Sequence, residues 1–463
     1  MSDVGQVDLA IRNASVITAS SRSETDIAIR GETIVQLGGA FTARREIDAS
    51  GKLVMPGGID MHVHLTPAVS ENGEMRWADD FASGTRAAAA GGITMVGNIT
   101  TPRPRQTVPA MLSEVAATVT EMAYVDFALH PVVLDPAELT ADDLAAMVDQ
   151  GHTSLKIFMV LGNFDGQARG YLDLMRRAAE LGMISLIHCE DGCIISHLVE
   201  RMVAAEKTGA QHYPASRPVY SEEVAVTRAI GFAEAADAPI YVVHLSSQAA
   251  LEACHRARAR GIEVYVETRP LYLYLTDERF AEPDAAKYIG QPPLRKQQDV
   301  DALWNGLWAG DIQTFCTDHA PWPLSDKLDP AADLTNLRPG VADLDTLLPM
   351  LFSAGVSAGR ISPHRFVEVT ATNAARLFGL FPRKGTIAVG SDADITIWDP
   401  NLTRPVDSAR TQTNADYSPY EGWMVSGWPV TTISRGRVVF DHGEIVGRPG
   451  WGRLARRGPS QML

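Results

Sequence analysis

The stretch GMISLIHCED, residues 182–191, shows the pattern that decides the fold of this chain. A glycine that can end a helix is followed by a short apolar run and then by polar residues. Four further stretches begin in the same way, and three more share the apolar run. The complete set is VMPGGIDMHVHL (54–65), GGITMVGNIT (91–100), AYVDFALHPVV (123–133), GHTSLKIFMV (151–160), GMISLIHCED (182–191), APIYVVHLSS (238–247), GIEVYVETRP (261–270) and GDIQTFCTDHAP (310–321). Continuous apolar runs of this kind are typical of parallel strands buried on both faces.

The segments between these eight runs have helical patterns, so the sequence predicts an α/β protein. SSQAALEACHRARARG (246–261) is a good example, because Ser246 or Ser247 can cap its first turn. Eight strand–helix units close into a (β/α)8 TIM barrel, which we expect to cover residues 55–383. A doubly wound open sheet is the structural alternative. No glycine-rich phosphate loop follows the first strand, which disfavours the nucleotide-binding version of that alternative.

The segments before and after the expected barrel have a different sequence pattern. Residues 1–54 and 384–446 contain short β runs broken by Gly, Asp and Asn turns, without intervening helices. We expect both ends of the chain to join into one small β-sandwich domain. The tail, residues 447–463, is basic and punctuated by Gly and Pro, and we expect it to lie in solvent or against another subunit.

Composition restricts the partners of the protein. The chain has 463 residues, a formal net charge of -15 and a sequence pI near 5.3. Nucleic acids and anionic membranes require a basic face, so we expect neither as a partner and favour a small-molecule substrate. Asp3 and Asp8 interrupt the apolar stretch that a signal peptide would need, and no apolar run reaches membrane-spanning length, which indicates a cytosolic protein. The cysteines have no disulfide spacing and are expected to be reduced: Cys189, Cys193, Cys254 and Cys316.

A histidine pair in the first expected strand points to a metal site. In GGIDMHVHL (57–65), His62 and His64 occupy alternate positions and therefore leave the strand on the same face. A lone buried histidine is more often a core residue, so the pair needs support from elsewhere. Polar residues at the carboxyl ends of other strands give that support, because barrel enzymes place their active sites there. The candidate ligands, sufficient for two divalent metals, are His62, His64, Lys156, His188, His244 and Asp318.

Lys156 is the unusual member of this set, since an ammonium group has no lone pair to give a metal. A buried lysine loses its proton readily, and the neutral amine can add CO2 to form a carbamate, an anionic ligand able to bridge two metals. The alternative is a lysine that pairs with a carboxylate. Imidazole together with carboxylate-type oxygen favours Zn²⁺, and Mn²⁺, Co²⁺ or iron less uniquely.

The remaining histidines are given structural roles. His130 lies near a strand end and is expected to pack behind the ligands. His319 neighbours Asp318 but should point away from it, so we expect it to support the site without binding metal. The others lie in helical or loop contexts and are expected at the surface: His152, His197, His212, His255, His364 and His442.

Together these residues resemble the amidohydrolase superfamily, in particular the branch of cyclic-amide hydrolases that contains dihydropyrimidinase, hydantoinase, allantoinase and dihydroorotase. The resemblance extends over nearly the whole chain. It rests on GGIDMHVHL, SLKIFM, IHCED, YVVHLSS, TDHAPW, QPPLR and LFGLFPRKGTIAVGSDADITIWDP. The resemblance implies that one metal is bound by His62, His64, carboxylated Lys156 and Asp318, and the other by Lys156, His188 and His244. It also implies a homo-oligomer, often a tetramer, with a dimer as the alternative.

The resemblance also implies a mechanism. Two metals lower the pKa of a bridging water and polarise the substrate carbonyl, and the resulting hydroxide attacks a cyclic amide. Asp318 then acts as general base for the attack and as general acid for the departing ring nitrogen.

Several positions depart from the hydantoinase pattern and concern the substrate. Leu161 stands where the branch has a tyrosine that binds the developing oxyanion, and Thr66 stands where hydantoinases have aspartate and dihydroorotases arginine. Gly290 and Gln291 replace the first two residues of CSPPLR, whose serine backbone holds the substrate amide. Asn336 is the candidate for the asparagine that completes amide recognition. We expect the loops 66–78 and 160–170 to wall the pocket.

Other functions remain open at this stage. Within the branch, the chain could be an allantoinase, a dihydroorotase or a less usual lactam or imide hydrolase. Deamination on a one-metal barrel would not need Lys156. A non-catalytic scaffold would have lost metal ligands, whereas all six are present here.

Overall fold

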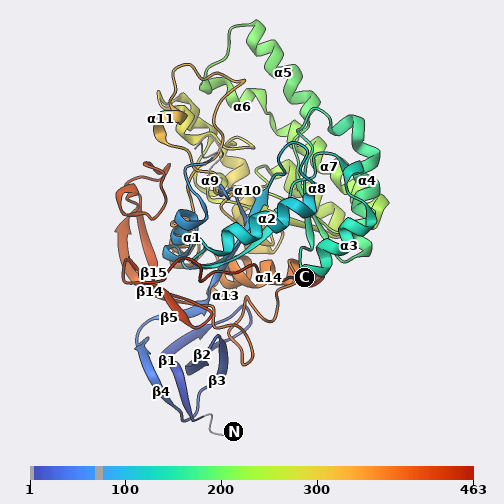
Figure 1. Ribbon diagram of the computed structural model, residues 1–463. Coiled ribbons are helices and arrows are strands. Elements are labelled where there is room, and N and C mark those ends of the chain that lie inside the picture. Colours follow the sequence, from blue (N-terminus) through green and yellow to red (C-terminus); the bar gives the residue numbers. More distant parts are fainter. Residues whose placement is uncertain (1–4, 68–76) are drawn as a thin grey trace.

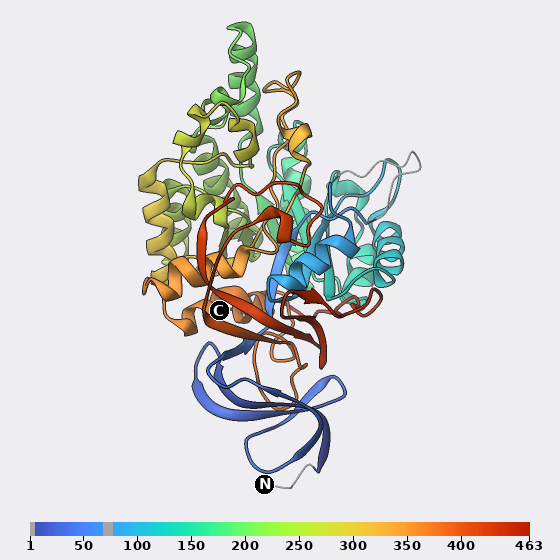
Figure 2. The ribbon, with the colours of Figure 1, turned by 90° about the vertical axis from the view of Figure 1, so that its left-hand side faces the viewer.

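The computed structural model describes residues 5–67 and 77–463 and confirms the predicted fold class. A barrel of parallel strands surrounded by helices stands above a smaller β domain (Figures 1 and 2). The blue N-terminal strands and the red C-terminal strands lie together in that smaller domain. The two ends of the chain therefore meet beside the barrel.

All eight expected barrel strands form where the apolar runs lie. Neighbouring strands pair in parallel, in one group of three and one of five. Two further parallel bridges, Val132 with Lys156 and Val63 with His319, join the groups at both edges, so the barrel is closed. In chain order the strands are β6 (Gly58–Val63), β7 (Ile93–Thr100), β8 (Asp126–Pro131), β9 (Ser154–Phe158), β10 (Ile184–His188), β11 (Ile240–Val242), β12 (Val264–Thr268) and β13 (Thr314–Phe315).

Helices form the outer layer of the barrel. Those that follow individual strands are α1 (Phe81–Ala90), α2 (Val108–Thr120), α3 (Ala141–Asp149), α4 (Phe164–Glu180), α7 (Val219–Ala236), α8 (Gln248–Arg258) and α10 (Gln297–Ala309). Ser247 caps α8 through its side chain, as its position in the sequence suggested. α5 (Gly192–Ala204) lies between β10 and α7, and the short helices are α6 (Tyr213–Ser216), α9 (Pro270–Tyr274), α11 (Leu324–Lys327), α12 (Leu347–Leu351), α13 (Pro363–Val367) and α14 (Asn373–Leu377). Across the described residues, no helix combines the length and apolar character needed to cross a bilayer.

The β domain is one mixed sheet of nine strands. The strands are β1 (Gln6–Ile17), β2 (Arg22–Arg30), β3 (Thr33–Leu37), β4 (Thr42–Asp48), β5 (Leu53–Pro56), β14 (Ile395–Pro405), β15 (Met424–Ser434), β16 (Arg437–Asp441) and β17 (Glu444–Ile445). The short strand β5 joins the two flanks, because it pairs in parallel with β1 and antiparallel with β14. It also leads directly into β6, which places the sheet beneath the first ligand-bearing strand.

The C-terminal tail does not lie free in solvent, which was one of its two expected positions. It instead lies on the base of its own barrel, where Phe127 of β8 donates to Arg453 O at 3.1 Å and accepts from Ala455 N at 2.8 Å. The Arg457 side chain is buried and donates to Ser154 Oγ at 2.9 Å. Residues near the start of β8 and β9 provide these partners, so the tail is held within the same chain.

This tail also explains a wrong prediction. His152 was expected at the surface, but it is buried at the base of the barrel. The backbone N–H of Arg457 donates to the carbonyl of Gly151, the residue before His152. Burial lowers the pKa of His152 to about 3. His130 is a packing residue, as expected, with its ring against Phe378.

Candidate metal centre

The six expected ligands gather at the carboxyl end of the barrel. His62, Lys156 and His188 belong to β6, β9 and β10, whereas His64, His244 and Asp318 lie just beyond β6, β11 and β13. His244 and Asp318 adopt left-handed backbone conformations, with φ of 37° and 50°. Such conformations cost non-glycine residues about 1–3 kcal/mol and concentrate at functional sites. The backbone strain thus occurs at two of the residues that face the cavity.

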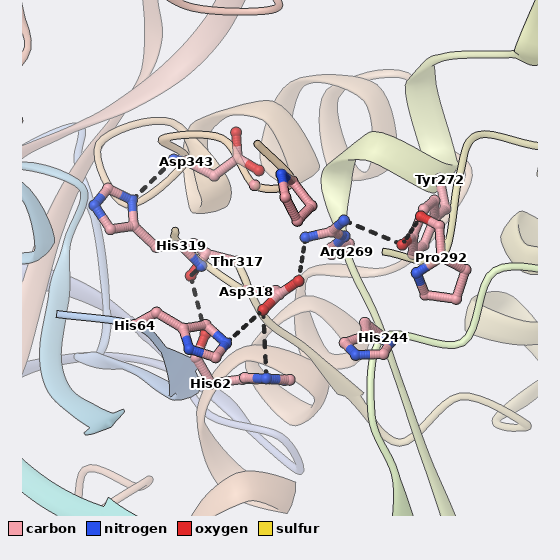
Figure 3. A network of polar contacts seen from close by, with 12 residues as sticks. His62, His64, His244, Arg269, Tyr272, Pro292, Thr317, Asp318, His319 and Asp343 are labelled. Atoms are coloured by element: carbon pink, nitrogen blue, oxygen red, sulfur yellow. Dashed lines mark hydrogen bonds and ion pairs between the residues drawn. The ribbon is translucent and has the colours of Figure 1, made fainter. Parts of the chain in front are cut away.

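One group of ligand atoms surrounds Asp318 (Figure 3). Oδ1 of Asp318 lies 3.0 Å from Nε2 of His64 and 3.4 Å from Nε2 of His62. The ligand atoms of these three residues all lie within 4.8 Å of one another. Donors that share a tetrahedral Zn²⁺ are about 3.3 Å apart, given metal–nitrogen bonds of about 2.0–2.1 Å. The spacing fits a divalent cation.

A second group lies beside the first. Nδ1 of His188 faces Nε2 of His244 at 2.9 Å. The ring of His244 is stacked on that of His62, with centroids 5.4 Å apart. Lys156 Nζ lies 3.4 Å from Nε2 of His62. The geometry therefore provides two adjacent sets of donors with the lysine at the first set.

The protonation states also suit a metal. Burial lowers the pKa of His64 to about 4 and lowers the pKa values of His188 and His244, so these imidazoles are neutral near pH 7. Neutral imidazole is the form that binds metals. Burial also lowers the pKa of Lys156 to about 8. Among the described residues its ammonium group has no carboxylate within ion-pair distance, so the alternative of a lysine–carboxylate pair finds no partner.

Buried carboxylates form hydrogen bonds with the imidazoles of His62 and His188. Nδ1 of His62 donates to Oε1 of Glu267 at 2.7 Å, and the same oxygen accepts from His244 N at 2.9 Å. Nε2 of His188 donates to Glu190 at 2.8 Å. These bonds select the tautomers that leave the opposite nitrogens free to bind metal. Sequence reasoning missed both glutamates, although each lies in a polar strand end, VETRP or IHCED, that the barrel pattern had already marked.

Glu267→Gln is expected to lower the affinity for Zn²⁺ by about 10–100-fold, because the amide no longer orients His62 as a carboxylate does. The dissociation constant can be measured by competition with a coloured chelator. Glu263→Gln, just before the same strand, is the matched control and should match the parent. An unchanged affinity in Glu267→Gln would show that Glu267 does not orient the ligand.

Asp318 also contacts a residue that sequence reasoning missed. Oδ2 of Asp318 accepts from Nη1 of Arg269, which directly follows β12 and is 0% exposed. Burial raises the pKa of the Asp318 carboxyl, but the Arg269 guanidinium and the nearby imidazoles outweigh burial and hold that pKa well below its usual range. Asp318 is therefore ionised. The signal in the sequence was the position of Arg269 at a strand end.

A cavity of about 1030 Å³ opens over these ligands. Five of the six expected ligands line it, and the sixth, Lys156, lies behind His62 with its Nζ 3.4 Å from Nε2 of that residue. Three predicted substrate-contacting residues, Thr66, Leu161 and Gln291, also line the cavity. Leu65, Trp77, Phe158 and Val160 give one wall an apolar character. A small organic molecule with an apolar part would fit next to the ligand atoms.

Two predicted substrate-contacting residues do not line the cavity. Gly290 packs against Arg269. Asn336 is exposed, and its side chain accepts from Asp333 N at 2.7 Å, so the amide is used in a local turn. Val160 and Leu161 line the cavity from the expected loop 160–170, but from Phe164 onward that segment belongs to helix α4. Most of the expected loop 66–78 lies outside the described residues.

Comparisons with known proteins agree over almost the full length. Residues 53–439 match the model of the Amidohydrolase family. The D-hydantoinases of Ralstonia pickettii and Rhizobium radiobacter are 38% and 37% identical, each over 97% of this chain and 99% of the relative. The crystal structure of D-hydantoinase from Bacillus sp. AR9 is similar with a TM-score of 0.94 at 35% identity, covering 98% of this chain and 100% of that one. L-Hydantoinase (dihydropyrimidinase) from Arthrobacter aurescens gives a TM-score of 0.89 at 32% identity, with 97% and 100% covered.

Proposed function

Because the chain belongs to the amidohydrolase family, we propose that it is a metal-dependent hydrolase that opens the ring of a cyclic amide of the hydantoin or dihydropyrimidine type. The resemblance inferred from the motifs is confirmed. One observation carries the proposal, namely the convergence of four imidazoles, a lysine and a carboxylate around a single cavity. Hydrolysis of carbon–nitrogen bonds in rings is the activity that this set of groups supports best.

The cofactor would be a pair of divalent cations, with Zn²⁺ the best match to these donors. His62, His64 and Asp318 would hold one cation, and His188 and His244 the other. We propose that Lys156 is carboxylated: its neutral amine adds CO2 and releases a proton, and the resulting carbamate would supply anionic oxygen ligands to the cations. Its complete burial and lowered pKa support this step. When bound, the cations would lower the pKa of water toward neutrality and polarise the amide carbonyl.

The protein's own groups would carry the proton and orient the substrate. The Asp318 carboxylate accepts the proton of the attacking water and delivers it to the ring nitrogen as the carbon–nitrogen bond breaks. The carbonyl carbon becomes a carboxylic acid, which ionises and releases the second proton of the water, and the ring nitrogen becomes a neutral amide N–H group of the opened product. Leu65, Phe158 and Leu161 exclude bulk water from this end of the cavity.

The ring substituent is proposed to be apolar. Leu161 offers no hydrogen-bond donor where the hydantoinase pattern has tyrosine, and Trp77 and Phe158 add aromatic surface. One relative, 35% identical, is named D-phenylhydantoinase. These points support an alkyl or aryl group on the ring.

A substrate panel tests the function. We expect hydantoin or dihydrouracil to be opened with a kcat/KM at least about 100-fold above that of dihydroorotate, because Thr66 offers a hydroxyl and no cation to a substrate carboxylate. Ring opening is followed by loss of ultraviolet absorbance. Allantoin and simple lactams and imides complete the panel. If allantoin or dihydroorotate proved the best substrate, that alternative within the branch would replace the hydantoinase assignment, and a metal-loaded protein that opens none of them would refute the proposal.

The remaining expectations follow the same resemblance. We propose a cytosolic enzyme that assembles as a homotetramer or dimer, acts on a small molecule and has no nucleic-acid or membrane partner. The acidic composition supports the exclusion of anionic partners.

A further inference from the structure

A continuous chain of hydrogen bonds connects Asp318 to the wall of the cavity. Nη1 of Arg269 donates to Oδ2 of Asp318, and Nη2 of Arg269 donates to the Tyr272 hydroxyl at 3.1 Å. That hydroxyl donates to the carbonyl of Pro292 at 2.6 Å. Pro292 follows Gln291, which lines the cavity. Figure 3 shows Arg269 between Asp318 and Tyr272, on the side of Asp318 opposite His62 and His64.

Gly290 makes room for this arginine. A Cβ atom at residue 290 would lie 2.1 Å from Nη2 of Arg269 and 2.9 Å from Cδ1 of Leu271. Gly290 is not among the glycines with a positive φ, so space and not backbone conformation requires glycine here. The glycine that replaces the first residue of the CSPPLR pattern therefore provides the space that the Arg269 side chain occupies.

The two carboxylate oxygens of Asp318 have different partners. Oδ1 faces the His64 and His62 nitrogens, whereas Oδ2 is held by the guanidinium. The terminal torsion of aspartate is broad, so an unheld carboxylate can rotate. A charge-assisted bond to a planar, buried guanidinium removes that freedom.

We propose that Arg269 is a positioning residue that fixes the carboxylate plane of Asp318 relative to the cavity wall, and that Gly290 is required to seat it. The inference rests on the proposed function, in which Asp318 carries the proton. A displacement of about 1 Å at a reacting group can cost about 100-fold in rate. Arg269 therefore influences turnover through Asp318 and not through contact with substrate.

Gly290→Ala is the mildest test, because the new methyl group meets the far end of the Arg269 side chain and leaves the charge in place. In the Zn²⁺-loaded full chain we expect kcat to fall by about 100-fold with KM within about threefold of the parent and metal content unchanged. Gly306→Ala on α10 is the matched control, since its Cβ would meet Cδ2 of Leu251 at 2.7 Å. That variant should keep the parent kcat.

Arg269→Met and Arg269→Lys separate geometry from charge. Methionine removes both hydrogen bonds and should lower kcat at least as much as Gly290→Ala. Lysine keeps the charge but cannot bind both Asp318 and Tyr272, so it should restore kcat only in part. In the Arg269→Met background, Gly290→Ala should add little further loss, because both changes act on the same contact. Additive losses, or full activity in Arg269→Lys, would overturn the positioning role.

The absorption spectrum of the Co²⁺-substituted protein gives a readout independent of turnover. The visible bands report the ligand geometry that includes Asp318, so they should change in Gly290→Ala and Arg269→Met and stay the same in Gly306→Ala. Altered bands in a protein that opens no cyclic amide would support the positioning role and refute the proposed function. A parent that opens the ring, with variants equal to it in kcat and spectrum, would refute the positioning role and leave the function standing.

Discussion

Lys156→Ala is expected to leave the barrel folded but unable to retain a pair of divalent cations, and its turnover should fall by at least about 10⁴-fold. In the proposed centre the lysine carbamate would be the protein group shared by the two cations. Lys156 has no ion-pair partner among the described residues, and the nearby carboxylates of Glu267 and Asp318 keep His62 and Arg269 as partners, so the fold should survive its removal. Metal content by elemental analysis, circular dichroism and ring-opening rate together test this.

A short carboxylate provides the decisive control for Lys156. Added acetate or propionate can occupy the space of the carbamate and should restore part of the metal content and of the rate. The exposed Lys207→Ala serves as a matched substitution and should behave as the parent. If Lys156→Ala stayed active without any added carboxylate, the carbamate role would be refuted.

Asp318→Asn is expected to keep at least one cation but to slow turnover by about 10³–10⁴-fold, because asparagine has a similar shape and cannot accept a proton. Single-turnover rates with an unsubstituted hydantoin measure the effect on the chemical step. Metal analysis of the same sample shows whether the slower turnover results from loss of metal.

The exposed Asp301→Asn is the corresponding control and should have no effect. Near-normal turnover of Asp318→Asn with full metal content would remove Asp318 from proton transfer. Metal analysis separates two explanations for a slow Asp318→Asn variant. If the variant loses both metals, Asp318 is needed for metal binding; if it keeps them, Asp318 is needed for proton transfer.

The barrel could be predicted because each of its strands is buried on both faces. Such strands appear as continuous apolar runs, and the closed topology brings their carboxyl ends together whatever their distance in sequence. That rule is sufficient to select His62, Lys156, His188 and Asp318 before any contact is known. Even the very short β13 was located, because Gly310 is followed by Ile312, Phe315 and Cys316 and then by a polar end.

Contacts of polar side chains could not be predicted in the same way. Arg269 and Glu267 are polar residues at a strand end, like the ligands, and nothing in the sequence states which of them faces a metal and which faces a carboxylate. Asn336 illustrates the opposite case, since the family resemblance suggested substrate recognition but a local turn uses its amide. His152 is buried by a tail that lies some 300 positions later in the chain. Such burial depends on tertiary packing alone.

Anomalous diffraction from crystals grown with Zn²⁺ and bicarbonate tests the central claim most directly. We expect two zinc peaks about 3.5–4 Å apart, one beside His62 and His64 and one beside His188 and His244, with electron density for a carbamate beyond Nζ of Lys156. An absence of peaks at these residues under saturating zinc, or zinc bound only elsewhere, would contradict the account.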